Sequence, residues 1–242
     1  MSSILFYEQP VELNREIHKA VKIGALADYA FAAKTNSVIL TGVEFIAAAK
    51  EYLIVFTRVG EEKIVPVVLL GLRDNENLYI DAAGKWDARY IPAFVRRYPF
   101  VFADFGSGVL TVCVDEASPV FNAEEGQALF NEDGANSPFL QNALTFLNDY
   151  QGQFARTEAF VNKLKKLDLL KEMTANAEMS DGAHFAMNGL LVINEQKLLE
   201  MDDKEVNGLF KSGELGWIYA HLISLSNMGR LAERFDVCRK RE

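Results

Sequence analysis

Residues 52–72, YLIVFTRVGEEKIVPVVLLGL, contain two runs that are rich in β-branched and aromatic residues. The first run covers 52–58, the second covers 64–72, and the Gly-Glu-Glu segment at 60–62 between them is typical of a turn. This pattern predicts an antiparallel β-hairpin. Pro66 has no N–H to donate, so it favours an edge position or a bulge near the start of the second strand.

The same reasoning predicts other strands on both sides of this hairpin. Gly-Ser-Gly at 106–108, between the apolar runs 100–105 and 109–114, indicates a second hairpin. Shorter strands are predicted at Ile4–Tyr7 and Leu78–Asp81, and short helices at Val43–Lys50 and Pro92–Arg97. The first half of the chain is therefore expected to be rich in strands.

The second half shows helical patterns. Ser137 and Pro138 indicate a helix start. A serine side chain accepts a hydrogen bond from a free N–H there, and a proline at the first helical position costs no helical hydrogen bond, because that N–H has no partner within the helix. The apolar spacing that follows predicts helix beyond Gly152 as far as Leu170. Further predictions are one strand or a hairpin over Ala183–Ile193 around Asn188 and Gly189, short helices capped by Asn194 and by Asp202 or Asp203, and an apolar helix over Leu215–Arg234.

Together these patterns predict an α+β fold, with a strand-rich N-terminal half and a helix-rich C-terminal half packed on a shared core. No linker rich in Pro, Gly or Ser divides the chain. One domain is therefore expected over residues 1–242, and a subdivision into a strand-rich 1–116 and a helix-rich 117–242 stays open.

The net charge of −9 comes mostly from one segment. Residues 98–155 contain no Lys or Arg, and their acidic residues are Asp104, Asp115, Glu116, Glu124, Glu125, Glu132, Asp133 and Asp149. A shortage of basic charge argues against binding to a nucleic acid backbone or to anionic lipid. The segment is expected to form a solvated acidic face or a surface for a basic partner.

The sequence also indicates a cellular compartment. No apolar run is long enough for a transmembrane helix. A secretory signal requires basic residues before its apolar region, and none precedes the first apolar run here. Cys113 and Cys238 lie far apart, which is typical of free thiols in a reducing compartment. A cytoplasmic location is expected, with export by a signal-independent route left open.

Local motifs for common catalytic sites are absent from the sequence. It has no glycine-rich phosphate loop, no nucleophile elbow and no closely spaced pair of histidines. A metal centre would need His184 and His221 to converge on a carboxylate from distant parts of the chain. His221 lies in an apolar helical pattern, which favours a core histidine with one hydrogen bond over a ligand. The sequence therefore predicts no metal site and no cofactor.

The most distinctive segment is WDARYIPAFVRRYPF, residues 86–100, which interleaves arginines with aromatic residues. Planar guanidinium groups beside aromatic faces can bind a carboxylate, a phosphate or a ring-bearing ligand. The candidate binding residues are Trp86, Tyr90, Arg96 and Arg97, with His221 as a further candidate. In the structural alternative, which we favour, the two adjacent arginines pair with acids of residues 98–155, since such pairs are common.

Short sequence segments along nearly the whole chain resemble, in the same order, those of the SapC-like bacterial proteins associated with a surface layer. They include Asn36-Ser37-Val38, Tyr90–Phe100, Cys113-Val114-Asp115-Glu116, Gly126–Phe130 and Tyr219–Leu225. Leu53 stands where the family pattern has a proline. The peptide-transporter permease of the same name has membrane-spanning helices, which this sequence does not contain.

The resemblance implies a bacterial source and an envelope or nutrient-uptake context. It also implies flavin-dependent halogenase-type enzymes and outer-membrane receptors as companions, and it brings no catalytic residues. The leading hypothesis is a non-catalytic binding or accessory protein that holds a protein partner or a small acidic or aromatic ligand. Two alternatives stay open, namely a metal-dependent oxygenase or other modifying enzyme, and a structural component of a surface layer.

Overall fold

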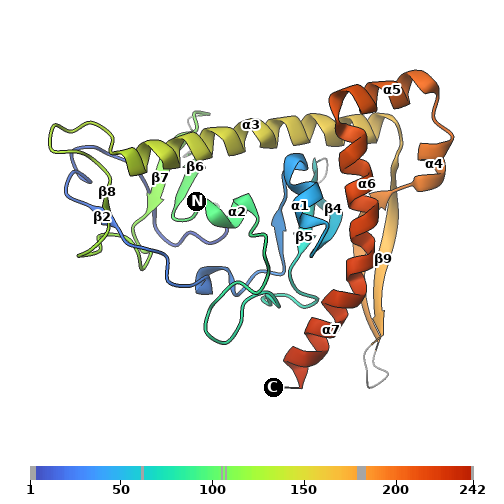
Figure 1. Cartoon of the computed structure of the whole chain (residues 1–242), viewed down its shortest axis with the longest axis horizontal. Helices are drawn as coiled ribbons and strands as arrows, with labels where there is room; N and C mark the ends of the chain where they lie inside the picture. The colour runs from blue at the N-terminus through green and yellow to red at the C-terminus, as the bar shows by residue number, and fades with distance from the viewer. Residues whose placement is uncertain (1–3, 61–62, 105, 107, 179–183, 241–242) are drawn as a thin grey trace.

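The structure is a computed structural model in which strands and helices are packed together (Figure 1). It describes residues 4–60, 63–104, 106, 108–178 and 184–240, with the backbone alone at 175–178 and 184–185. The α+β fold class is confirmed. Glu61 and Glu62 of the first predicted turn, Phe105 and Ser107 of the second hairpin, and Ala183 at the start of a predicted strand lie outside the described residues.

The largest sheet has five strands in the order β3-β5-β4-β10-β9. Its strands are β3 Ser37–Ile39, β4 Leu53–Val59, β5 Lys63–Leu69, β9 Leu170–Glu178 and β10 His184–Ile193. The predicted first hairpin is confirmed as β4 and β5, which pair antiparallel with Phe56 opposite Pro66. β3 pairs with Val67, Val68 and Leu69 of β5, so Pro66 lies just beyond that ladder, where its missing N–H interrupts no pairing with β3.

The β9–β10 hairpin brings the second half of the chain into this sheet. β10 pairs with β4 on one side and with β9 on the other. Of the two predictions for this stretch, the strand is right over the described residues 184–193, because Asn188 and Gly189 form a bulge between Met187 and Leu190 instead of a turn. β9 was not predicted, and helix as far as Leu170 is wrong. The helix ends at Lys166, and Asp168 takes the left-handed φ of +51° before the strand begins.

A second sheet has the order β1-β7-β6, with β1 Pro10–Glu12, β6 Phe100–Ala103 and β7 Thr111–Asp115. β6 and β7 confirm the second predicted hairpin. The predicted strand at Ile4–Tyr7 is wrong, because Phe6 has a φ of +81° and the Tyr7 N–H donates to the Ile4 carbonyl in a turn. Leu78–Asp81 is not a strand either and makes a single bridge, between Ile80 and Trp86.

A two-stranded ribbon, β2 Lys22–Ile23 with β8 Gln127–Ala128, joins parts of the chain that are about a hundred residues apart. The helices are α1 Phe45–Ala48, α2 Ala93–Arg96, α3 Pro138–Lys166, α4 Glu195–Leu199, α5 Asp203–Ser212, α6 Glu214–Ser224 and α7 Met228–Arg239. Figure 1 shows that α3 extends along one side of the molecule, from the β2–β8 ribbon at one end to α5 and α6 at the other.

Predicted helix caps are confirmed at three positions. The side chains of Ser137, Asn194 and Asp202 accept hydrogen bonds from backbone N–H groups in the first turns of α3, α4 and α5. The predicted helix over Leu215–Arg234 is interrupted, since a 3₁₀ turn at Leu225–Asn227 separates α6 from α7.

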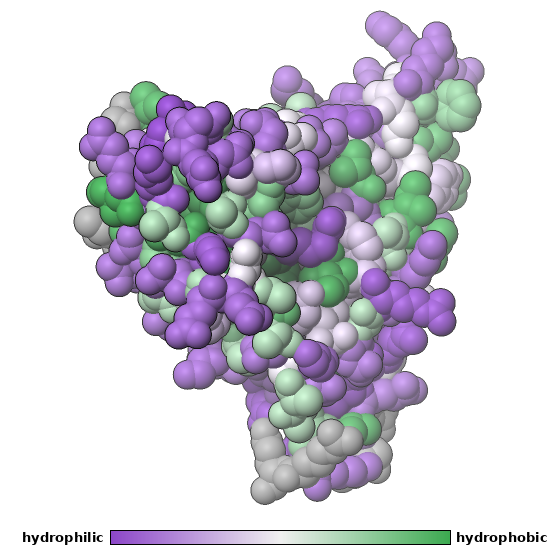
Figure 2. Space-filling model, turned by 60° about the vertical axis from the view of Figure 1, so that its left-hand side comes forward, coloured by the Kyte–Doolittle hydropathy of each residue, from purple (hydrophilic) through white to green (hydrophobic). Residues whose placement is uncertain are grey.

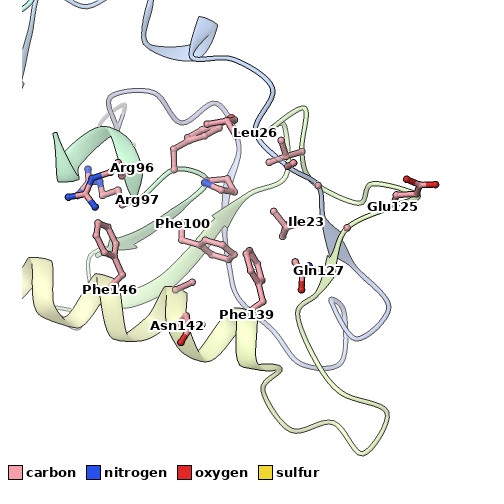
Figure 3. A pocket seen from close by; sticks show the side chains of 17 residues that line it. Ile23, Leu26, Arg96, Arg97, Phe100, Glu125, Gln127, Phe139, Asn142 and Phe146 are labelled. Carbon is pink, nitrogen blue, oxygen red and sulfur yellow. The ribbon is translucent and has the colours of Figure 1, made fainter. Parts of the chain in front are cut away.

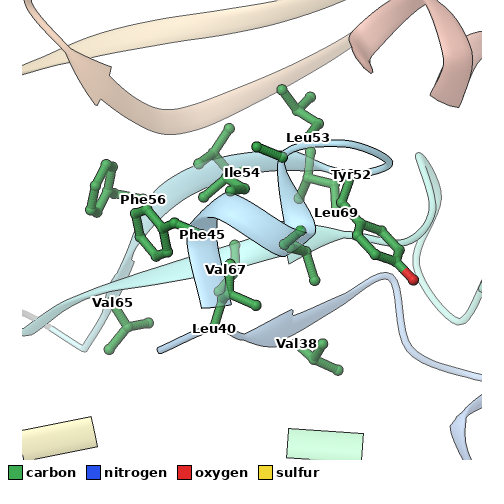
Figure 4. Close-up of a cluster of buried hydrophobic side chains, with 14 of the residues drawn as sticks. Val38, Leu40, Phe45, Tyr52, Leu53, Ile54, Phe56, Val65, Val67 and Leu69 are labelled. Atoms are coloured by element: carbon green, nitrogen blue, oxygen red, sulfur yellow. The ribbon is translucent and has the colours of Figure 1, made fainter. Parts of the chain in front are cut away.

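The main hydrophobic core draws residues from both halves of the chain. Figure 4 shows side chains of its N-terminal part, including Phe45, Ile54 and Phe56 on α1 and β4. Phe160 of α3 and Ile218 of α6 are fully buried in the same cluster. On the outside, the face in Figure 2 is mostly hydrophilic, with hydrophobic residues gathered toward its middle and right-hand side.

Ser137→Ala is expected to destabilise the protein by roughly 1–2 kcal/mol. Ser137 Oγ accepts from Leu140 N (3.1 Å) and donates to Ala128 O (2.6 Å), so this one hydroxyl caps α3 and also ties it to β8. Urea unfolding of both proteins measures the loss. Ser226→Ala is the control, since Ser226 is exposed outside the long helices and its hydroxyl makes one bond, to Ile223 O. Equal stability of the wild type and the Ser137 variant would contradict the expectation.

Candidate functional site: a groove that ends in two arginines

Trp86 lies in the core, away from the two adjacent arginines. Its ring is buried, and its Nε1–H donates to Tyr52 Oη at 2.7 Å. The Tyr52 hydroxyl in turn donates to the backbone carbonyl of Tyr90. Trp86 therefore holds the backbone at the start of the arginine-rich segment and is not among the residues that line the groove beside the arginines.

Tyr90 is half-buried and binds a buried carboxylate. Its hydroxyl donates to Glu44 Oε1 at 2.7 Å, and the Ala93 N–H donates to the same oxygen at 2.7 Å. The other carboxylate oxygen accepts from the N–H and the hydroxyl of Thr41. Burial and the Glu44 charge raise the pKa of Tyr90, so its hydroxyl stays protonated and keeps donating. This network fixes the first turn of α2.

α2 begins after Pro92 and ends at Arg96, and Arg97 follows it; the side chains of both arginines lie on aromatic rings. Arg96 is exposed; its Nε–H donates to Ile91 O at 2.9 Å, and its guanidinium carbon lies 5.1 Å from the centre of the Phe146 ring. Arg97 is half-buried, and its guanidinium carbon lies 4.0 Å from the ring centre of Phe94. The rings of Tyr150 and Tyr7 lie 5.3 and 5.9 Å from it.

The Arg97 charge has no carboxylate partner among the described residues. Its Nε is buried without a hydrogen-bond partner. Asp115, the buried acid of the neighbouring sheet, already accepts from the N–H groups of Glu8 and Gln9. The favoured structural interpretation, in which Arg96 and Arg97 pair with acids of residues 98–155, is therefore wrong for the part of the chain that the structure describes. The Arg97 guanidinium also partly offsets the rise that burial causes in the pKa of the Tyr7 hydroxyl.

A groove of about 720 Å³ opens beside these two arginines. Its larger apolar side chains are Ile23, Leu26, Phe100, Val120, Phe139 and Phe146, and its charged and amide side chains are Arg96, Arg97, Glu125, Gln127 and Asn142. In Figure 3 the arginines lie together at one end next to Phe146, and Phe100 and Phe139 lie in the middle. Ile23 and Gln127 lie toward the β2–β8 ribbon, and Glu125 is farthest from the arginines.

The sequence identified only the arginine end of this groove. Its aromatic floor comes from α3, where Phe139, Ala143 and Phe146 line the cavity. These residues follow the i, i+4, i+7 spacing of one helix face, beside the face formed by buried Leu140 and Leu147. The sequence shows that α3 has a second apolar face next to the face that packs on the core. Nothing in the sequence places this second face opposite Arg96 and Arg97.

His221 lies elsewhere, fully buried in the main core on α6. Its Nε2 accepts a hydrogen bond from the Ile193 N–H at 3.1 Å, and burial lowers its pKa to about 4. The prediction of a core histidine with one hydrogen bond is confirmed. The side chain of His184 lies outside the described residues. Among the side chains that are described, no group of three or more His, Cys, Asp or Glu residues could hold a metal ion.

The fold and the groove together define an α+β protein with an open, mainly apolar groove that ends in two arginines. None of the helices that the structure describes combines the length and the hydropathy needed to cross a membrane. The SapC family model matches residues 13–231, and the chain belongs to the SapC family. A search of curated proteins and a search of solved structures each found no match.

Proposed function

We propose that this SapC-family chain is a non-catalytic binding protein whose groove holds a small organic acid. The supporting observation is the Arg97 guanidinium, which lies at the end of an apolar groove with aromatic rings around it and no carboxylate against it among the described residues. A planar guanidinium binds a carboxylate through two parallel, charge-assisted hydrogen bonds. The apolar lining would hold the remainder of such a ligand.

The wider role that we propose is that of a cytoplasmic accessory protein. The family resemblance suggests an envelope or nutrient-uptake system and flavin-dependent halogenase-type enzymes as its setting. The metal-dependent oxygenase needs His221 as a ligand, but that side chain is fully buried in the core, and among the described side chains no group of three or more possible metal ligands includes it. No contact among the described residues specifically favours the surface-layer role.

Arg97→Met is expected to weaken binding of decanoate at least tenfold. Methionine keeps much of the length of the apolar stem but removes the guanidinium, which lies on Phe94 and Tyr150 and would pair with a carboxylate. A charged hydrogen bond contributes about 1.5–3 kcal/mol. Titration calorimetry of decanoate into wild type and variant measures the difference.

Arg156→Met is the matched control. Arg156 also lies on an aromatic ring, 4.5 Å from the ring centre of Trp217, but it does not line the groove. The Arg156→Met variant should bind decanoate with the affinity of the wild type. If Arg97→Met fails to fold, Arg97→Lys keeps the charge without the planar fork and should lose part of the affinity. A wild type that binds neither decanoate nor the shorter acids down to butyrate, or an Arg97 variant that folds and binds like the wild type, would refute the proposed function.

A further inference from the structure

We propose that the groove takes an elongated monocarboxylic acid, with the carboxylate at Arg97 and an apolar chain extended along α3. This rests on the proposed function and adds the class and the orientation of the ligand. The two arginines lie at one end of the groove and Gln127 and Glu125 toward the other, and the side chains between them are mainly apolar, with Asn142 on α3 as a polar exception (Figure 3). A ligand that matches this lining has one charged end and a long apolar part.

The floor of the groove is long and has a gap in its middle. Phe139 and Phe146 lie two helical turns apart on α3, which corresponds to about 10 Å along the helix axis. Ala143 lies between them, and its methyl group leaves room that a larger side chain would occupy. The floor therefore suits an extended chain better than a compact, globular molecule.

The end of the groove at Arg96 and Arg97 suits a ligand with a single negative charge. The described contacts of the Arg97 guanidinium are to the rings of Phe94, Tyr150 and Tyr7 and to the Tyr7 hydroxyl, which stays protonated, so none of them neutralises the charge. Arg96 is exposed, and its Nε is already used by Ile91 O. One half-buried guanidinium matches one planar carboxylate, whereas a doubly charged phosphate carries more hydration to lose in an apolar groove.

The far end of the groove is lined by exposed polar residues and offers no second cation among the residues that line it. Gln127 and Glu125 come from the 120–127 segment and β8, and the nearest basic residue of the ribbon, Lys22, bonds to Glu124 O. A dicarboxylic acid with a charge at each end would place its second carboxylate near Glu125. Like charges repel, so we expect a monocarboxylate to bind better than the dicarboxylate of the same length.

The experiment is a calorimetric titration of the full chain with the series butyrate, hexanoate, octanoate and decanoate. We expect the affinity to rise about fourfold for each methylene group that the groove buries, until the groove is full. Decanol and the dicarboxylate of equal length should bind at least tenfold more weakly than decanoate.

Ala143→Phe fills the middle of the groove and leaves both arginines in place. It should flatten the dependence on chain length, because the introduced ring occupies the space along α3 that the longer acids would fill. Thr145→Phe is the matched control, because Thr145 is exposed on α3 and does not line the groove.

Each alternative result has a distinct meaning. Acids that bind through Arg97 with no dependence on chain length would overturn this inference and leave the proposed function intact. Phenyl phosphate binding more tightly than decanoate would overturn it in favour of a phosphate ligand. If no acid of the series binds, both this inference and the proposed function fall.

Discussion

Gly42→Ala is expected to lower the free energy of unfolding by about 3 kcal/mol. Gly42 begins a 3₁₀ turn ahead of α1, and a Cβ added there would overlap ring carbons of Trp217 on α6. Trp217 has little freedom to move, since its ring packs edge-on against Phe160 at 5.2 Å between centres. The Gly42 N–H also donates to Thr157 Oγ1 on α3 at 2.8 Å. A shift at this point would therefore disturb three elements at once, and urea unfolding would measure the cost.

Gly152→Ala is the matched control for that substitution. Gly152 is exposed in the middle of α3, and an added Cβ would meet nothing within 4 Å. Alanine should therefore stabilise the helix by roughly 0.5–1 kcal/mol through its higher helix propensity. Opposite signs for the two substitutions are expected. A Gly42 variant as stable as the wild type would show that α6 can move away from the 3₁₀ turn at little cost.

The protein is expected to lose roughly 3 kcal/mol of stability through His221 as the pH falls from 6.5 to 4. Burial lowers the pKa of the folded-state imidazole to about 4, whereas in the unfolded chain it keeps its ordinary value of 6.5. Between these two pH values the unfolded chain binds a proton that the folded chain does not. Unfolding is therefore favoured as the pH falls through this window, and the contribution is fully present above pH 6.5.

His221→Gln isolates this contribution from the carboxylates that titrate in the same range. Glutamine can still accept a hydrogen bond from the Ile193 N–H but does not take up a proton. Urea unfolding of both proteins at several pH values between 7 and 4 should give a steeper fall for the wild type. Parallel curves for the two proteins would show that His221 is not the titrating group.

What the sequence could predict was the structure that depends on neighbouring residues. Ser137, Asn194 and Asp202 cap helices through hydrogen bonds to N–H groups three residues away, so their role is visible in a short window. β9 was missed because Leu164, Leu167 and Leu170 fit a helical period. The left-handed turn at Asp168 follows the end of that helix, and the sequence lacks the glycine that usually indicates such a turn.

The candidate site shows the same limit more sharply. Arg96 and Arg97 were predicted because guanidinium groups and aromatic residues alternate in one segment. Trp86 belongs to that segment but points into the core, and an irregular loop has no period from which its direction could be read. Phe139 and Phe146 complete the groove from α3 because of tertiary packing, which no local pattern encodes.

The walls of the groove come from residues 23–26, 96–100, 120–127 and 139–146, which meet only when the chain is folded. The unfolded chain therefore cannot bind what the folded groove binds, and by mass action any occupant must raise the melting temperature. A ligand at about one hundred times its Kd adds about 2.7 kcal/mol to the free energy of unfolding. Heat resistance in the presence of cell extract fractions can thus serve as an assay that requires no prior guess about the ligand.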